Sequence, residues 1–255
     1  MGIKDLFGGG NKKKTEFREK AKEVLSDGKI APGKAEALAR LSEEHQIENP
    51  ADDKTMLRRE IYNKAAGNVR GRGKLTEVES AELAKIQKFL ALRDDQVDKT
   101  KRDLNRLKLL TEVRQGNLPT LTKDHPSLRG LMLDNGEIAH WAVQVDVLDR
   151  PTTMGRDGVA VKWNSPYVSR PAKVHGMPHE GAKELGEGYL VVTNKRVLFK
   201  GDRAAAVNYS PQAEFFLYAE GLRIQRTVGN TLLRFKAGTD DTAEIVGELL
   251  AALMK

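Results

Sequence analysis

The sequence contains no cysteine, no long apolar run and no long apolar segment at its start, and each absence excludes a class of protein. Without cysteine in its 255 residues, the chain cannot form disulfides, cysteine-based zinc sites or a catalytic thiolate. No stretch approaches the roughly 18 apolar residues of a membrane-spanning helix, and no secretory signal is recognisable. The opening "MGIKDL" has Leu6 where an N-myristoylation pattern requires Ser or Thr. These absences favour a cytoplasmic protein.

The motifs of the common enzyme classes are also missing. There is no G-x-S-x-G, no P-loop and no H-E-x-x-H pattern. His175 and His179 flank "GMP" in a loop with Gly and Pro, which does not hold two imidazoles on one helical face as a metal pair requires. The sequence therefore predicts no catalytic residue, no metal site, no cofactor and no enzymatic activity.

The net charge of +7 is concentrated in the first part of the chain. Residues 1–115 hold 26 Lys and Arg against 20 Asp and Glu, a surplus of +6, whereas the remaining residues hold 17 against 16. A basic surplus favours an acidic partner such as nucleic acid or an anionic membrane. A well-solvated helical surface has the same composition, so the charge leaves these interpretations open.

Residues 1–14 have the composition of a flexible tail, with three consecutive glycines between an apolar tip and a lysine run. An apolar tip followed by lysines could also contact an anionic membrane, although three apolar side chains are too few to anchor a protein alone. The residues of this candidate membrane tip are Ile3, Leu6, Phe7, Lys12, Lys13 and Lys14.

From residue 15 to about residue 115, leucine and isoleucine recur at three- and four-residue spacings between charged positions, which predicts helices. An internal repeat lies here, because "DGKIAPGKAEALARL" (27–41) aligns with "RGKLTEVESAELAKI" (72–86). The aligned pairs are Gly28 with Gly73, Leu38 with Leu83, and Leu41 with Ile86. Glycine supplies the positive φ that closes a helix. The segment is predicted to be an all-α domain of helical repeats.

A helix, a glycine turn and a second helix are also the outline of an EF-hand, but the loop residues exclude calcium. Calcium sites need oxygen ligands that end in a bidentate Glu. Loop positions 1, 3, 5 and 12 hold Glu23, Leu25, Asp27 and Lys34 in the first unit, and Asn68, Arg70, Arg72 and Glu79 in the second. Leucine, lysine and arginine do not bind calcium, so no calcium site is predicted.

Basic residues of the helical part suggest a nucleic-acid interface as an alternative. The Gly-rich "NVRGRGK" carries Arg70, Arg72 and Lys74, which could contact backbone phosphates. No aromatic residue is interleaved with these charges for base stacking, and acidic neighbours such as Asp94 and Asp98 dilute the positive face. The sequence therefore ranks nucleic acid below a protein or membrane partner.

Residues 116–136 are predicted to be a partly ordered linker, and beyond them the apolar spacing changes from helical to alternating. One face of the first strand is predicted to hold Ala139, Trp141, Val143, Val145 and Val147. His140 falls on the opposite face, where we expect solvent. Seven or eight short strands in a barrel or sandwich are predicted. The final helix has an apolar stripe that should pack on them, formed by Ile245, Val246, Leu249, Leu250 and Leu253.

The stretch "GEGYLVVTNKRVLFKG" (186–201) predicts a β-hairpin, because two apolar runs flank the two residues Asn194 and Lys195. Two-residue hairpin turns favour residues that tolerate positive φ, and Asn does so best after Gly. We therefore expect Asn194 to adopt that conformation.

The sequence around this hairpin resembles a known family. "GYLVVTNKRVLFKG" (188–201) is similar to the strand–turn–strand pattern of GRAM and bacterial pleckstrin-homology-like (PH-like) domains, and "EGLRIQR", a further strand and the terminal helix follow in the same order. The likeness covers roughly residues 130–255 and implies a PH-like β-barrel over residues 137–255, capped by the C-terminal helix. The helical repeats of residues 15–115 resemble degenerate EF-hand-like or TerB-like modules.

The resemblance implies an α+β protein that binds or scaffolds and is not an enzyme. Eukaryotic relatives bind phosphoinositides through basic residues, and some bacterial ones assemble into rings. The candidate ligand-binding residues here are Lys195, Arg196, Lys200 and Arg203. Because lysine on a strand edge also prevents edge-to-edge pairing, an anionic ligand and a solvated edge are both open interpretations.

Together these observations predict a cytoplasmic adaptor that binds a protein partner, which can be a second copy of the chain. The first alternative is a sensor of anionic lipid, peripheral to the inner face of the membrane. The second is a nucleic-acid binder that uses the helical part.

Overall fold

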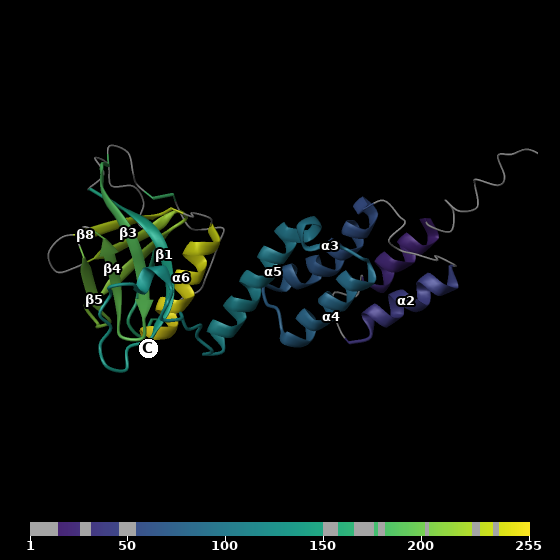
Figure 1. Cartoon of the computed structure of the whole chain (residues 1–255), viewed down its shortest axis with the longest axis horizontal. Helices are drawn as coiled ribbons and strands as arrows, with labels where there is room; N and C mark the ends of the chain where they lie inside the picture. Colours follow the sequence, from purple (N-terminus) through teal and green to yellow (C-terminus); the bar gives the residue numbers. More distant parts are fainter. Residues whose placement is uncertain are drawn as a thin grey trace, which may run out of the picture. The chain divides into compact units, whose positions relative to one another are not determined.

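The computed structural model of the chain is an α+β structure with two compact units, residues 1–111 and 112–255 (Figure 1). It describes residues 15–25, 32–45, 55–149, 158–165, 176–177, 182–201, 204–225, 230–236 and 240–255. Several predicted features lie outside the described residues: the tail 1–14 with Ile3, Leu6, Phe7, Lys12, Lys13 and Lys14, and also Arg203, His175 and His179.

Unit 1 consists of helices, as the leucine spacing predicts. Residues 15–24 are helical, and they are followed by α2 (Lys34–Glu44), α3 (Thr55–Arg72), α4 (Glu77–Phe89) and α5 (Asp94–Arg114), whose last residues belong to unit 2. Their apolar faces form one buried cluster. Within the described ranges, no helix combines the length and the apolar composition needed to cross a bilayer.

The internal repeat places equivalent residues in one core. Leu38 and Leu41 of α2 are buried in the same cluster as Leu83 and Ile86 of α4, and the two helices contact each other. Gly73 has a φ of +66°, which is the conformation predicted at the end of a helix. The equivalent glycine of the first unit lies outside the described residues.

Unit 2 is built on one antiparallel sheet. Its strands are β1 (Ala139–Leu148), β2 (Val159–Lys162), β3 (Glu184–Thr193), β4 (Arg196–Gly201), β5 (Ala205–Asn208), β6 (Glu214–Tyr218), β7 (Gly221–Gln225) and β8 (Asn230–Phe235). Their order in the sheet is β2-β6-β7-β8-β1-β3-β4-β5. The α+β class is confirmed. The predicted closure into a barrel is not confirmed, because β2 and β5 are the two edges of an open sheet.

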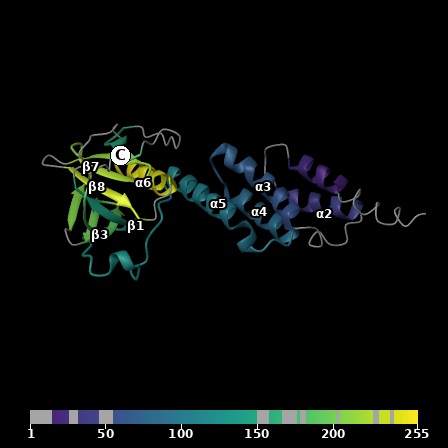
Figure 2. The same ribbon diagram turned by 90° about the horizontal axis from the view of Figure 1, so that it is seen from above.

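The C-terminal helix α6 (Asp240–Leu253) packs on this sheet, as its apolar stripe predicts. Val246, Leu249 and Leu250 are completely buried and Ile245 is nearly so, whereas Leu253 is half-buried. The helix contacts β3, which lies on one side of β1 in the strand order, and also β2 and β6, which lie on the other side. The strands therefore curve around α6, as Figures 1 and 2 show.

The first strand departs from simple alternation at His140. The prediction that this side chain faces solvent is wrong: it is buried, and its Nδ1 donates to the Pro119 carbonyl at 2.6 Å. The register of β1 with β3 shifts between Ala139 and Trp141, which is the position of a bulge that interrupts alternation. The alternating residue pattern of the strand also cannot show that the segment before it covers the His140 side chain.

Candidate functional site

The segment before β1 lies against the sheet, and we call residues 117–138 the strap. Its amide at Leu121 donates to the Ala139 carbonyl at 2.8 Å, and it contains the short helix η2 (Pro126–Leu128). Leucines of the strap pack on a small buried cluster of β1, β3 and β4. The residues of this contact are Leu121, Leu128, Leu131 and Leu133 of the strap with Ala139, Val191 and Leu198. The strap is therefore a layer of unit 2.

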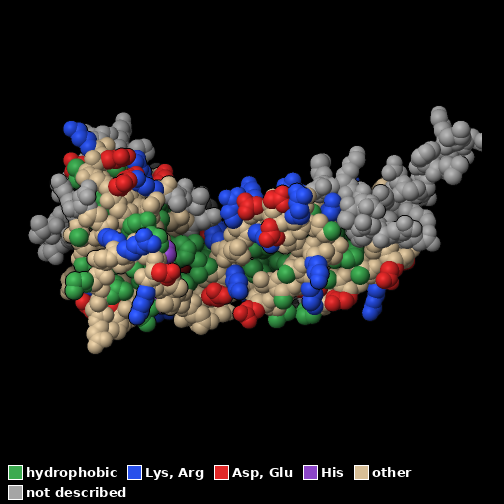
Figure 3. Space-filling view, in the orientation of Figure 1, with side chains coloured by type: hydrophobic (Ala, Val, Ile, Leu, Met, Phe, Trp, Pro, Cys, Tyr) green, Lys and Arg blue, Asp and Glu red, His purple; other side chains and the backbone are tan. Residues whose placement is uncertain are grey.

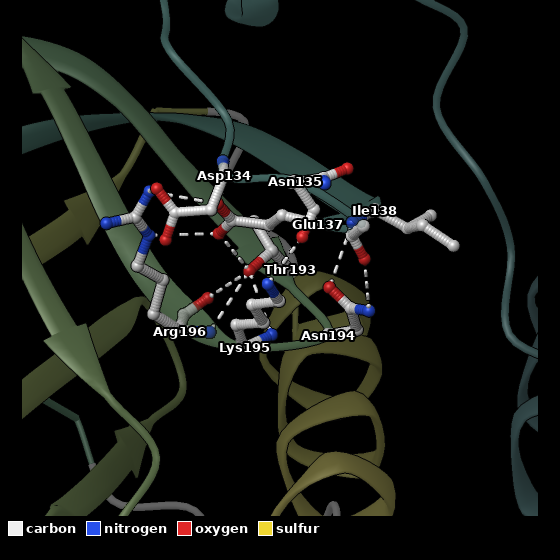
Figure 4. Close-up of polar contacts among 9 residues, drawn as sticks. Asp134, Asn135, Glu137, Ile138, Thr193, Asn194, Lys195 and Arg196 are labelled. Atoms are coloured by element: carbon white, nitrogen blue, oxygen red, sulfur yellow. Dashed lines mark hydrogen bonds and ion pairs between the residues drawn. The ribbon is translucent and has the colours of Figure 1, made fainter.

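The two turn residues of the β3–β4 hairpin hold the end of the strap (Figure 4). Asn194 Oδ1 accepts from the Ile138 amide at 2.9 Å, and Asn194 Nδ2 donates to the Gly136 carbonyl at 3.1 Å. The backbone amide of Asn194 also donates to the Ile138 carbonyl at 3.0 Å. Lys195 Nζ donates to the Asn135 carbonyl at 2.7 Å. The turn thus binds the strap mainly through backbone groups of residues 135–138.

The conformation of the turn differs from the predicted one. Only two described non-glycine residues have positive φ, and neither lies in the turn, so the expectation for Asn194 is wrong. Thr193 Oγ1 instead accepts from the amides of Lys195 and Arg196 at 3.1 and 3.0 Å, which closes the turn through a side chain. The two-residue connection itself is confirmed. Asn194 serves here through its side-chain contacts with the strap.

Beside the turn, Arg196 forms a bidentate ion pair with Glu137 of the strap. Arg196 Nε lies 2.9 Å from Glu137 Oε1, and Arg196 Nη2 lies 2.8 Å from Glu137 Oε2. Thr193 Oγ1 donates to Oε1 at 2.7 Å and the Asp134 amide donates to Oε2 at 2.8 Å. Each carboxylate oxygen of Glu137 therefore accepts two hydrogen bonds. The Glu137 side chain is completely buried, while that of Arg196 is 18% exposed.

These contacts keep the buried carboxylate charged. Burial by itself would raise the pKa of Glu137, but the hydrogen bonds from Arg196, the Asp134 amide and Thr193 outweigh it and hold that pKa below its ordinary value. The hydrogen bond with Glu137 also raises the pKa of Arg196. We call Glu137, Thr193, Asn194, Lys195 and Arg196 the latch, because together they hold the end of the strap on the hairpin.

Three of the four predicted ligand-binding residues contact the strap. Arg196 faces Glu137 and also lies 3.3 Å from Asp134 Oδ1. Lys195 belongs to the latch, and Lys200 Nζ donates to the carbonyls of Arg129 and Pro126. Arg203 lies outside the described residues. An anionic ligand would have to compete with these contacts, and anion binding at this place stays a prediction.

Sequence reasoning missed Glu137 and Thr193, which complete the latch. Composition made the strap look like a linker, where a glutamate is expected in solvent. The usable signal was the position of Glu137 two residues before a strand, together with an arginine directly after a two-residue turn. Thr193 carried a weaker signal, since threonine before a turn often accepts hydrogen bonds from the next amides.

Two apolar side chains of the strap face solvent. Met132 is 89% exposed and Ile138 is 44% exposed. Met132 stands between Leu131 and Leu133, which both pack toward the sheet, so its direction follows from alternation along an extended chain. Figure 4 shows the Ile138 side chain directed away from the polar contacts of the latch. The strap therefore presents apolar surface while its backbone is fixed.

The residues of the nucleic-acid alternative lie in unit 1, and two of them are paired with carboxylates. Arg70 Nη2 lies 2.8 Å from Asp103 Oδ2, and Arg72 forms an ion pair with Glu79; Lys74 is exposed. In Figure 3, acidic and basic side chains are interspersed over the visible face of the helices. The pairing reduces the positive potential available to phosphate, and nucleic-acid binding stays a prediction.

A comparison of the chain with protein-family models, curated proteins and solved structures finds no match. Within the described residues, no group of three or more His, Asp or Glu is placed to hold a metal ion. The latch and the exposed apolar residues of the strap are therefore interpreted from their geometry.

Proposed function

We propose that the protein is a non-enzymatic cytoplasmic adaptor or scaffold whose C-terminal unit, a PH-like domain, binds a protein partner through the strap. The observation that carries this proposal is the exposure of Met132 and Ile138 on a segment that the latch fixes to the hairpin. The partner can be a second copy of the chain.

The PH-like assignment is supported by the way the sheet is divided. The long strand β1 pairs with β3 on one side and with β8 on the other, so it joins a β1-β3-β4-β5 half to a β1-β8-β7-β6-β2 half. The terminal helix α6 contacts strands of both halves. A bent sheet with one amphipathic helix at its end is the plan that the hairpin sequence implied.

Met132 and Ile138 favour a binding surface because the segment that carries them is rigidly held. Single exposed apolar residues are common on protein surfaces, but here one backbone segment carries two of them and is held by hydrogen bonds and a buried ion pair. A preorganised segment loses little conformational entropy on binding. Methionine is enriched in protein interfaces and adapts to the shape of a partner. The geometry therefore favours a protein-binding surface.

The same geometry favours a protein over an anionic membrane. Lys195 and Lys200 donate to strap carbonyls, and the charge of Arg196 is offset by Glu137. Membrane attraction of this kind depends on cations that remain available to lipid headgroups. These three cations are engaged in contacts within unit 2, and this weakens the lipid-sensor alternative.

The proposal is tested with the double variant Met132→Ser/Ile138→Ser and the control Val78→Ser, which removes a 55% exposed apolar residue of α4. Proteins crosslinked to the full chain in cells are quantified by mass spectrometry, and self-association is measured by sedimentation velocity. We expect one crosslinked partner, or the self-association, to be lost in the double variant and kept in the control. Equal results for all three proteins, or binding only to phosphatidylserine vesicles, would overturn the proposal.

A further inference from the structure

The strap ends in a turn that contains a chemically labile pair of residues. The Glu137 amide donates to the Asp134 carbonyl at 2.9 Å. Gly136 has a φ of +72°, whereas Asn135 is not among the described non-glycine residues with positive φ, so the turn is of type II with Asn135 and Gly136 at its centre. Asn135 is the only asparagine of the sequence that is followed by glycine. Glycine carries no side chain that would hinder attack of its backbone nitrogen on the preceding side-chain amide.

The peptide bond between these two residues is open to water. Both Asn135 and Gly136 are exposed, and Lys195 Nζ donates to the Asn135 carbonyl at 2.7 Å. The carbonyl and the N–H of a trans peptide point in opposite directions. The Gly136 N–H is therefore directed away from Lys195, where hydroxide can remove its proton and leave a nucleophilic nitrogen.

The latch holds this turn in a conformation that does not react. Ring closure needs the Cα–Cβ bond of Asn135 nearly to eclipse the bond from its carbonyl carbon to the Gly136 nitrogen, whereas the ψ of about +120° in a type II turn keeps the two bonds apart. Rotation to the reactive geometry moves the Asn135 carbonyl away from Lys195. It also disturbs the hydrogen bonds of the Asn194 side chain with the Gly136 carbonyl and the Ile138 amide. The rate of attack should therefore follow the fraction of molecules in which the latch is open.

We propose that Asn135 is a site of spontaneous deamidation and that the latch controls its rate. The deprotonated Gly136 nitrogen forms a bond with Asn135 Cγ, the bond from Cγ to Nδ2 breaks, and Nδ2 leaves as ammonia after taking a proton from water. Water then adds to one of the two carbonyls of the succinimide ring, which opens to aspartate or isoaspartate. Water is the only co-reactant. This modification does not rest on the proposed partner-binding function.

Either product changes the end of the strap. Isoaspartate carries the main chain through its side chain and lengthens it by a methylene group, which shifts the Gly136 carbonyl and the Ile138 amide relative to Asn194. Both products add a carboxylate next to Asp134, which already shares Arg196 with Glu137. Like charges at this spacing repel each other. Because hydrolysis of the amide is not reversed in water, molecules with a loosened strap should accumulate with time.

The full chain is incubated at mildly alkaline pH, both folded and in urea, and the conversion of each asparagine is followed by mass spectrometry of its peptides. We expect Asn135 to react faster than every other asparagine in urea and far more slowly in the folded protein. Asn194→Ala removes two hydrogen bonds to the strap and should accelerate the folded-state reaction about tenfold. Lys195→Met removes one and should accelerate it about threefold. Both substituted positions are exposed, so both variants should fold.

Lys200→Met is the matched control, because Lys200 contacts the strap at Pro126 and Arg129, outside the turn, and it should leave the rate unchanged. Met132→Ser/Ile138→Ser should also leave it unchanged, so the result is separate from that of the proposed function. Equal rates in the folded and the unfolded chain, equal rates in Asn194→Ala and Lys200→Met, or no conversion of Asn135 in urea would each overturn the proposal.

Discussion

Two carboxylates of unit 2, Glu137 and Asp146, are both buried and both pair with cations, but they differ in how exposed these cations are. The Glu137 side chain is completely buried and that of its partner Arg196 is 18% exposed. Asp146 lies 2.8 Å from Arg234 Nη2 and 3.3 Å from Lys236 Nζ, and both of these cations are more than a third exposed. The two pairs therefore have similar geometry in different surroundings.

The difference decides what happens when one partner is removed. Near solvent, the remaining charge is hydrated, and exposed ion pairs contribute little to stability. In the interior, the remaining charge stays without water and destabilises the fold strongly. Glu137 also holds the strap, which presents the proposed partner-binding residues, whereas Asp146 connects neighbouring strands β1 and β8. The comparison predicts a large effect at the latch and a small one at Asp146.

Arg196→Ala has the largest expected effect. The variant leaves the charge of Glu137 buried and unpaired, which should lower the free energy of unfolding of unit 2 by about 3–5 kcal/mol. Both tryptophans of the chain lie in unit 2, at positions 141 and 163, so their fluorescence during urea unfolding reports on this unit. Arg93→Ala, which removes an exposed ion pair with Asp95, should leave the transition unchanged. Equal transitions in the two variants would contradict the role of the latch.

The contribution of Glu137 should disappear in acid. Because its pKa is lower in the folded protein than in the unfolded chain, its stabilisation is complete above the unfolded value of about 4.3 and is lost as pH falls through the folded pKa. The difference in free energy of unfolding between the unchanged protein and Glu137→Gln should therefore be constant near neutral pH and shrink below about pH 4. A difference that persists unchanged in strong acid would contradict the assignment.

Thr193→Val should have an intermediate effect. The variant keeps the shape of the side chain but removes the acceptor for the amides of Lys195 and Arg196 and the donor to Glu137. Loss of these hydrogen bonds should lower the free energy of unfolding by about 2 kcal/mol. Thr193→Ser keeps the hydroxyl and serves as the matched control in the same fluorescence experiment. If Ser and Val destabilise equally, the loss comes from packing and the hydroxyl has no role in the latch.

The parts of the fold that the sequence predicted well are those governed by local periodicity. Leu38 and Leu83 recur at helical spacing within a repeat and share one core, and Leu249 and Leu250 bury one side of α6. The hairpin was equally readable, because two apolar runs flank a turn of fixed length. In each case the information lies within about twenty consecutive residues, where the period of the apolar positions reveals the element.

The candidate site was less predictable, because it joins segments distant in sequence. Glu137 and Arg196 are separated by 59 positions, and nothing in either segment identifies the other. His140 was expected in solvent because alternation describes a strand and carries no information about the strap that covers it. Arg196 and Lys200 were interpreted as candidate ligand-binding residues from their charge and from the resemblance to PH-like domains. Whether a cation binds a ligand or its own chain depends on tertiary neighbours, which composition does not contain.

Asp146→Asn has the smallest expected effect and completes the comparison. The amide keeps the size of the side chain and removes the charge that faces Arg234 and Lys236, while Glu184 and Glu187 remain as anionic partners of these cations. Because the cations are also hydrated, the free energy of unfolding should fall by about 1 kcal/mol or less, and the difference should shrink further in 1 M salt, where screening is strong. The same salt should leave the Arg196→Ala loss largely intact, because ions do not reach a buried carboxylate. A salt-insensitive loss at Asp146 that matched the Arg196 variant would show that burial of the pair does not set the difference between the two sites.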